Sequence, residues 1–402
     1  MNKRQEPRLR FKGFTGEWKN KTLGDLGRVE MCRRIFKEQT QPSGEIPFFK
    51  IGTFGQEPDA FISSELFEEY RQKYPYPKQG DILISAAGTI GRTVEFTGEN
   101  AYFQDSNIVW LRFDESQITS TFLNITYQNI KWGLEGSTIK RLYNSDLLSA
   151  EITLPSFPEQ THLGLFFRRL DSQIAESRAV LEKSRQLKKA MLAQMFPANG
   201  EKIPKIRFKG FEGEWECRKL GEVANFTKGS GYSKSDLTEE GFPIILYGRL
   251  YTQYETVIKN VDTFVSFDKK ALKSLGNEVI VPASGETSED IARASVVYQK
   301  GVILGGDLNV ITPNKDIDSA FLALSLTNGK CNRELAKKAQ GKSVVHLHNS
   351  DLQECEILFP FLKEQTQIGN FFRQLDETIA LQSAEVEKLN QLKKGLLAAM
   401  LV

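Results

Sequence analysis

Two long stretches of the chain repeat hydrophobic residues at alternating steps of four and three positions. This period is typical of a helix that packs along one seam in a coiled coil. At 1.5 Å rise per residue, about 37 helical residues would form a rod of roughly 55 Å. The seam residues are Leu163, Phe167, Leu170, Ile174, Leu181 and Met191 in the first stretch, and Ile368, Phe372, Leu375, Ile379, Val386, Leu389 and Leu396 in the second.

Neither helix can bury its seam alone, so we predict that the two helices pair with each other. The chain between them is long enough to permit either relative direction. The alternative is that each helix lies on the core of its own domain.

Short hydrophobic runs, rich in β-branched and aromatic residues and separated by Gly, Pro and Asn, precede each long helix and predict mixed α/β structure. The Ser-Ala-Ala-Gly segment at 85–88 stands where Pro-Ala-Ser-Gly stands at 282–285, which predicts one fold with two different surfaces. The predicted strands are 46–51, 81–85, 93–96, 107–111, 243–247, 278–281, 294–298 and 308–311, and the predicted short helices lie near 120–132 and 319–339.

The chain repeats itself at the edges of its two halves. The strap Pro7–Trp18 (Pro-Arg-Leu-Arg-Phe-Lys-Gly-Phe-Thr-Gly-Glu-Trp) returns at 204–215, and the segment 142–196 returns at 347–401. The residues between these blocks barely resemble their counterparts. A duplicated scaffold with divergent inserts indicates that the scaffold performs one task twice, whereas the inserts perform two different tasks.

Composition narrows the class of protein. A chain of 402 residues, 40% hydrophobic and 26% charged, is long enough for two domains with separate cores. The net charge of +2 neither demands nor excludes nucleic acid. No stretch approaches the ~20 apolar residues that cross a bilayer, and the N-terminus lacks an apolar leader, so we expect a cytoplasmic protein. Four widely spaced cysteines argue against a disulfide framework and against a cysteine zinc site.

Catalytic motifs are weak or missing. The Asp/Asn-Pro-Pro-aromatic loop of amino-methyltransferases is absent. Residues 336–343 resemble a phosphate-binding loop, but the expected order of strand and helix is reversed. His346 and His348 would share one side of a strand, yet no third zinc ligand stands at a standard spacing. The sequence therefore predicts a non-catalytic protein.

The duplicated motifs resemble the DNA-specificity subunit of type I restriction–modification enzymes. The resemblance covers nearly the whole chain. It rests on the Arg-Phe-Lys-Gly-Phe-x-Gly-Glu-Trp strap, the Gly-Ser-Thr and Gly-Lys-Ser segments before Asn-Ser-Asp-Leu, the Glu-Gln-Thr-x-x-Gly-x-Phe-Phe-Arg-x-Leu-Asp helix start and the Gln-Leu-Lys-Lys end. Each motif is weak by itself, but the set occurs twice in the same order.

The resemblance implies an α+β architecture in which two α/β target recognition domains are joined and spaced by two long antiparallel helices with an internal pseudo-two-fold repeat. The expected segments are 1–155 and 199–360 for the two domains, and 156–198 and 361–402 for the spacer helices. Each domain would read one half of a bipartite target in double-stranded DNA. Two modification subunits would supply S-adenosylmethionine and methylate adenine, and restriction subunits would supply ATP-driven, Mg²⁺-dependent cleavage. This chain itself would bind no cofactor and no metal.

Side chains that could contact DNA are basic, hydroxyl-bearing or aromatic residues near predicted turns. A plain solvated surface is the alternative for each of them. The Gly-Thr-Ile-Gly turn at 88–91 would bring its backbone close to a phosphate, and a plain hairpin turn is the equal alternative. The candidates are Arg33, Arg34, Arg92, Lys140 and Arg141 in the first domain, and Lys228, Ser230, Tyr232, Lys234, Arg249, Arg293 and Lys342 in the second.

Several polar residues are identical between the halves: Glu159 and Glu364, Gln160 and Gln365, and the Lys-Lys pairs at 188–189 and 393–394. This identity predicts that one kind of partner binds twice. Two other functions remain open at this point. The first is a coiled-coil adaptor whose inserts bind protein rather than DNA, and the second is a fused nuclease–methylase.

Overall fold

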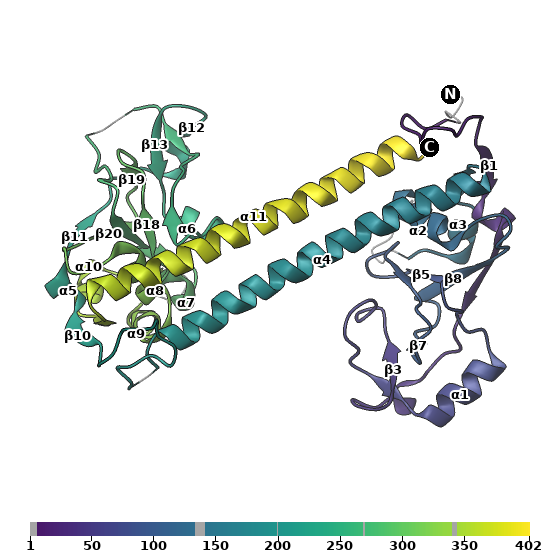
Figure 1. Ribbon diagram of the computed structural model, residues 1–402, viewed down its shortest axis with the longest axis horizontal. Helices are drawn as coiled ribbons and strands as arrows, with labels where there is room; N and C mark the ends of the chain where they lie inside the picture. Colours follow the sequence, from purple (N-terminus) through teal and green to yellow (C-terminus); the bar gives the residue numbers. More distant parts are fainter. Residues whose placement is uncertain (1–5, 133–140, 199, 268–269, 340–343) are drawn as a thin grey trace. The chain divides into compact units, whose positions relative to one another are not determined.

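The computed structural model describes residues 6–132, 141–198, 200–267, 270–339 and 344–402. Contacts divide the chain into two compact units. Unit 1 comprises Met1–Ser177 with Glu385–Val402, and unit 2 comprises Arg178–Ala384. Both long helices are confirmed: α4 spans Phe157–Met195 and α11 spans Leu362–Met400, and each helix contributes one part to each unit (Figure 1).

Unit 1 is built on an antiparallel sheet with the strand order β2-β8-β5-β6. A smaller sheet has the order β4-β3-β7, with β3 parallel to β7, and β1 pairs with β9. The strands are β1 (Lys19–Thr22), β2 (Gly27–Met31), β3 (Ile46–Phe49), β4 (Phe61–Ile62), β5 (Ile82–Ser85), β6 (Thr93–Glu95), β7 (Tyr102–Phe103), β8 (Ile108–Phe113) and β9 (Glu151–Leu154). The helices other than α4 and α11 are α1 (Ser64–Lys73), α2 (Ser120–Asn129) and α3 (Asn144–Leu148), with 3-10 turns η1 (Leu23–Asp25) and η2 (Lys37–Gln39).

Unit 2 repeats this topology. Its central sheet has the order β11-β20-β16-β18-β14, its smaller sheet has the order β12-β15-β13-β19 with β13 parallel to β19, and β10 pairs with β22. The strands are β10 (Glu216–Lys219), β11 (Ala224–Lys228), β12 (Leu237–Thr238), β13 (Phe242–Ile245), β14 (Val257–Ile258), β15 (Phe264–Val265), β16 (Glu278–Pro282), β17 (Ser284–Gly285), β18 (Ser295–Val297), β19 (Ile303–Leu304), β20 (Leu308–Pro313), β21 (Val345–His346) and β22 (Glu356–Phe359). The helices are α5 (Leu220–Val223), α6 (Arg249–Thr252), α7 (Ser288–Ile291), α8 (Ser319–Thr327), α9 (Gly329–Lys338) and α10 (Asn349–Gln353), with the 3-10 turn η3 (Lys234–Asp236).

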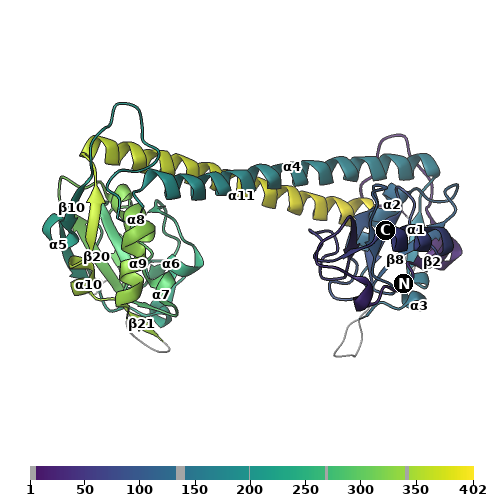
Figure 2. The same ribbon diagram turned by 90° about the horizontal axis from the view of Figure 1, so that it is seen from below.

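The strands β5 and β16 carry consecutive buried hydrophobic residues because both faces of each central sheet are covered. In unit 1, Ile82 and Ile84 of β5 enter the core beneath α2 and α4, whereas Leu83 between them enters the core shared with the smaller sheet. Val279 and Ile280 of β16 divide between two cores of unit 2 in the same way. Figure 1 shows this layering in unit 1, and Figure 2 shows α8 beside the central sheet of unit 2, where it contacts β16 and β18.

The hydrophobic seams pack against two neighbours at once. Leu163 and Phe167 at the start of α4 share one core with Leu397 and Met400 at the end of α11, and with the domain of unit 1. In unit 2, the end of α4 meets the start of α11. The ring centre of Phe196, which directly follows α4, lies 5.5 Å from that of Phe321 in α8 and 6.3 Å from that of Phe372 in α11. Each unit therefore pairs the two helices in opposite directions and also seats them on a domain core, so both packing arrangements considered from the sequence are present.

The short predicted elements are largely confirmed. The predicted strand at 81–85 is β5, and the one at 308–311 lies within β20. The helix predicted near 319–339 is in fact two helices, because α8 ends at Thr327 and α9 begins at Gly329.

Candidate nucleic-acid interface

The same backbone arrangement follows the central strand of each unit. After β5, Ala86 N–H donates to Asn107 O at 2.8 Å, and Leu142 N–H donates to Ala86 O at 2.8 Å. After β16, Ala283 N–H donates to Asp307 O at 2.8 Å, and Leu347 N–H donates to Ala283 O at 3.0 Å. We call these places the strand-end corners: residues 86–87, 104–107 and 141–143 in unit 1, and residues 283–284, 305–307 and 346–348 in unit 2.

Two of the predicted DNA-binding arginines meet at the corner of unit 1. Arg34 Nε donates to Asp105 Oδ2 at 2.8 Å, and its side chain keeps 60% of its surface exposed. Arg141 Nη2 donates to Ser106 O at 3.2 Å. Both guanidiniums therefore lie on the loop between β7 and β8 and stay open to solvent.

The other two arginines predicted in unit 1 lie on neighbouring elements. The guanidinium of Arg33 stands 5.3 Å from the ring centre of Tyr74, at the end of α1. Arg92 is half-buried and donates to Gly55 O at 3.2 Å. Lys140 and Lys342, with the Gly-Ser-Thr segment at 136–138 and the Gly-Lys-Ser segment at 341–343, lie outside the described residues.

The Gly-Thr-Ile-Gly turn is the hairpin between β5 and β6. Gly91 has φ +82°, and a Cβ there would lie 2.5 Å from Trp132. Ser85 Oγ accepts from Arg92 N–H at 2.9 Å across the turn. The positive φ and the packing against Trp132 therefore account for Gly91 without a phosphate.

Unit 2 places its candidates less uniformly. Lys228 at the end of β11 and Lys234 in η3 are exposed. Ser230 Oγ accepts from Leu272 N–H at 2.7 Å, and Arg293 is half-buried.

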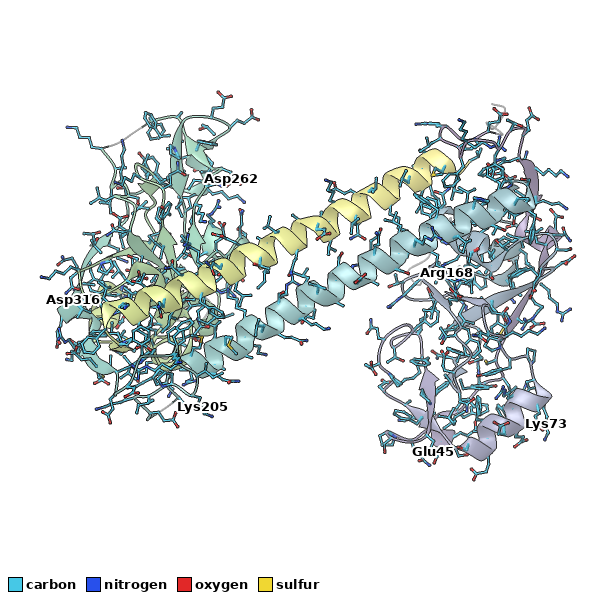
Figure 3. All side chains as sticks on the ribbon, in the orientation of Figure 1. Glu45, Lys73, Arg168, Lys205, Asp262 and Asp316 are labelled. Atoms are coloured by element: carbon cyan, nitrogen blue, oxygen red, sulfur yellow. The ribbon has the colours of Figure 1, made fainter. Side chains whose placement is uncertain are left out.

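Two candidates of unit 2 are buried against partners within the domain, and a DNA contact for them stays a prediction. Tyr232 keeps only 8% of its surface exposed and stacks on Phe267 with 5.8 Å between ring centres. The Arg249 side chain is 9% exposed and binds Asp262 at 2.6 Å and Glu255 at 2.9 Å (Asp262 is labelled in Figure 3). The sequence does not predict these partners, because an arginine that binds a carboxylate in the fold and one that binds a phosphate of DNA look the same in sequence.

The duplicated polar residues also have internal partners. Arg10 binds Glu159 through two bonds of 2.6 and 2.7 Å, and Arg207 binds Glu364 through two bonds of 2.7 and 2.8 Å. Both carboxylates are 1% exposed. These pairs tie each strap to the start of one long helix.

The strap backbone also reaches the end of the other long helix. Leu9 N–H donates to Ala399 O at 2.9 Å in unit 1, and Ile206 N–H donates to Gln194 O at 2.9 Å in unit 2. Gln160 is buried as well, and its amide binds backbone groups at Pro155, Gln117 and Thr119, as the buried Gln365 does at the equivalent places in unit 2.

The repeated lysines bridge the two helices: Lys188 binds Asp376, and Lys393 binds Asp171. Internal clamping thus explains the identity at Glu159, Gln160, Lys188 and their counterparts. The expectation that one kind of partner binds twice stays a prediction, because these internal bonds account for the identity without testing partner binding.

The groups whose pKa rises most are buried or half-buried in the cores. Burial raises the pKa of the Cys32 thiol to about 12 and that of Tyr76 to about 12. Within the ranges that the model describes, no three His, Cys, Asp or Glu side chains are grouped to hold a metal ion. These shifts follow from hydrophobic surroundings rather than from a cleft that prepares a reacting group.

Comparison with known proteins decides the family. The model of the type I restriction modification DNA specificity domain matches this chain twice, at residues 15–183 and 212–391. The chain belongs to this family. It is a DNA-specificity subunit, which is a non-catalytic component of a type I restriction enzyme.

Related specificity subunits cover different shares of the chain. A stretch of 139 residues is 62% identical to the putative type I restriction enzyme specificity subunit S.HindORF215P of Haemophilus influenzae, and it spans 34% of this chain and 36% of that protein. The type I restriction enzyme MjaVIII specificity subunit of Methanocaldococcus jannaschii is 22% identical over 80% of this chain and 75% of its own length.

A solved structure supports the fold of this specificity subunit. The type I restriction–modification S subunit from M. genitalium superimposes with a TM-score of 0.68 at 17% identity and covers 99% of both chains. Within the described residues, no helix is both long and apolar enough to cross a bilayer.

Proposed function

We propose that each unit of this specificity subunit reads one half of an asymmetric, split sequence in double-stranded DNA. The observation that carries this proposal is one topology built twice with different side chains at equivalent surface positions. The corner of unit 1 presents Arg34 and Arg141, whereas that of unit 2 presents His346. Two unlike surfaces on one fold favour two unlike half-sites.

The helices α4 and α11 would set the unread spacer between the half-sites. Each helix runs without interruption from one unit into the other. Because DNA presents the same groove about every 34 Å, a fixed separation selects which pairs of groove segments can be contacted together.

The partners follow from the same proposal. We expect two modification subunits to bind this chain and to methylate adenine, and restriction subunits to join the same complex. S-adenosylmethionine, ATP and Mg²⁺ would bind to those subunits, and this chain would bind none of them. The duplicated clamps favour two equivalent docking places, because they hold both ends of the helix pair in the same local geometry.

The test is an adenine-methylation map of a host that lacks other adenine methylation, with the modification subunits expressed with and without this chain. The expected result is one split motif, present only with this chain. Unchanged methylation in the presence of a stable complex would contradict the proposal and favour an adaptor that binds protein.

A length variant tests the spacer. Seven residues inserted after Ser177 and seven after Ala384 preserve the heptad phase and lengthen both helices by about 10 Å. We expect both half-sites to be unchanged and the spacer to grow by about three base pairs, at 3.4 Å each. The matched control carries the insertion in α4 alone, which leaves the two helices unequal and should abolish methylation.

A further inference from the structure

One short segment is nearly identical in the two units and differs only at particular exposed positions. Its sequence is Arg-Leu-Tyr-Asn-Ser-Asp-Leu at 141–147 and His-Leu-His-Asn-Ser-Asp-Leu at 346–352. Leu142 and Leu347 are buried, at 4% and 0% exposure. The backbone N–H of each leucine donates to the corner alanine of its unit, Ala86 or Ala283.

The part of the segment that is identical in the two units, Asn-Ser-Asp-Leu, forms and caps a short helix. Asp146 Oδ2 accepts from Tyr143 N–H at 3.1 Å, and Asp351 Oδ2 accepts from His348 N–H at 2.9 Å. The backbone is therefore held the same way in both units, and side chains at equivalent positions are presented in the same direction.

The two positions that differ alternate with the buried leucine and lie on the exposed face. Unit 1 places Arg141 and Tyr143 there, and Tyr143 is 62% exposed. Unit 2 places His346 and His348 there, with rings nearly parallel at 8° and centres 6.5 Å apart.

One exposed position inside the segment does not differ, because Ser145 and Ser350 are both exposed and are the same residue. Within the segment the change falls on the two side chains that flank the buried leucine at each corner. Directly after the segment, the exposed residues Ser149 and Glu354 differ as well.

The corner opposite each segment carries polar groups suited to DNA. Arg141 pairs across a β-bridge with Ala87, and His346 pairs in the same register with Ser284, whose Oγ lies 3.4 Å from His346 Nδ1. Asn349 Nδ2 donates to Thr227 O at 3.1 Å, which brings the segment beside the end of β11 and its exposed Lys228.

From this geometry we infer that positions 141 and 143 in unit 1, and positions 346 and 348 in unit 2, carry side chains that select the bases of the two half-sites. The inference rests on the proposed function. A guanidinium binds guanine through two bonds, and an imidazole offers one donor and one acceptor to a base edge. Basic side chains beside these corners, such as Arg34 next to Asp105 and Lys228 at the end of β11, would hold phosphates.

Exchange of the pairs tests this inference in the complete complex with the modification subunits. The variant H346R/H348Y should change or relax one or two base positions in one half-site, and it should leave the other half-site and the spacer as in the wild type. The reciprocal variant R141H/Y143H should alter only the other half-site. Discrimination at the affected base should fall by about tenfold to a hundredfold, which is the range of one good base contact. Tyr298→Ala, at a residue 64% exposed in unit 2, is the control and should leave the motif intact.

Binding of the purified complexes to duplexes with single base substitutions completes the test. An unchanged motif in H346R/H348Y would overturn the inference, and so would an equal loss of affinity for every sequence, because that result describes phosphate contacts. If the wild-type complex itself methylates no split motif, the proposed function fails instead. A variant could lose all methylation because it does not fold, and circular dichroism and complex assembly detect this. In that case the variant H346A/H348A is measured in the binding assay, and it must lose discrimination between bases for the inference to stand.

Discussion

The clamp between Arg207 and Glu364 should hold the strap of unit 2 in place. Glu364 is 1% exposed, and its two oxygens accept both bonds from Arg207, which also donates to Gly213 O at 2.6 Å. Arg207→Met would leave a buried carboxylate without its cationic partner. The loss of one partner from a buried pair costs about 3–5 kcal/mol, and we expect about 3 kcal/mol because the arginine is 13% exposed.

Hydrogen exchange read by mass spectrometry measures this cost locally. The strap opens to solvent when the clamp fails, so protection of the Ile206 and Trp215 amides, which bond to Gln194 O and Lys202 O, should fall by about 150-fold. The strap 7–18 of unit 1 is an internal reference within the same molecule, since its own clamp is intact.

Two variants separate the effect of breaking the ion pair from the effect of removing one positive charge. Lys205→Met removes an exposed strap cation two positions away and should not change protection (Lys205 is labelled in Figure 3). The double variant R207M/E364Q removes both charges and should return to within about 1 kcal/mol of the wild type. Exchange that changes by less than about threefold in Arg207→Met, or that rises equally in both straps, would refute the reasoning.

Three further predictions concern stability and reactivity. Gly164→Ala should destabilise the protein by about 1–3 kcal/mol in urea unfolding, because the new Cβ would lie 2.2 Å from Thr121 Oγ1, whereas Gly369→Ala, with its nearest neighbour at 3.0 Å, should change stability by less than about 1 kcal/mol. Burial favours a raised pKa for Glu278, but bonds from Ser274 and from backbone amides outweigh burial and lower its pKa below the ordinary 4.5. The stability that Glu278 contributes is therefore present above about pH 4.5 and lost as pH falls through the folded-state pKa. The urea midpoint of unfolding, measured between about pH 3 and 6, should consequently fall less on acidification in Glu278→Gln than in the wild type; an equally steep fall would contradict this. A thiol reagent should label only Cys217 in the native protein and all four cysteines in denaturant, because the other three are buried; rapid labelling of a second thiol would show that this burial is not maintained.

The sequence alone determined the elements whose signal is local. The four-three period places α4 and α11, and short runs of mostly hydrophobic residues place β5 and β20, because burial imposes its pattern on consecutive residues. The segment at 85–88 and its counterpart at 282–285 also predicted one fold built twice. These inferences need no knowledge of which distant residues meet.

Only the tertiary structure decided what the polar side chains bind. Arg10 and Glu159 are separated by 149 positions, and Lys393 and Asp171 by 222, so no local pattern could pair them. The same residue type ends in different surroundings: Arg249 binds Asp262 and Glu255, whereas Arg141 stays exposed at its corner. The physical reason is that a charged side chain satisfies itself with any suitable partner within a few ångströms, and folding alone determines which partner that is.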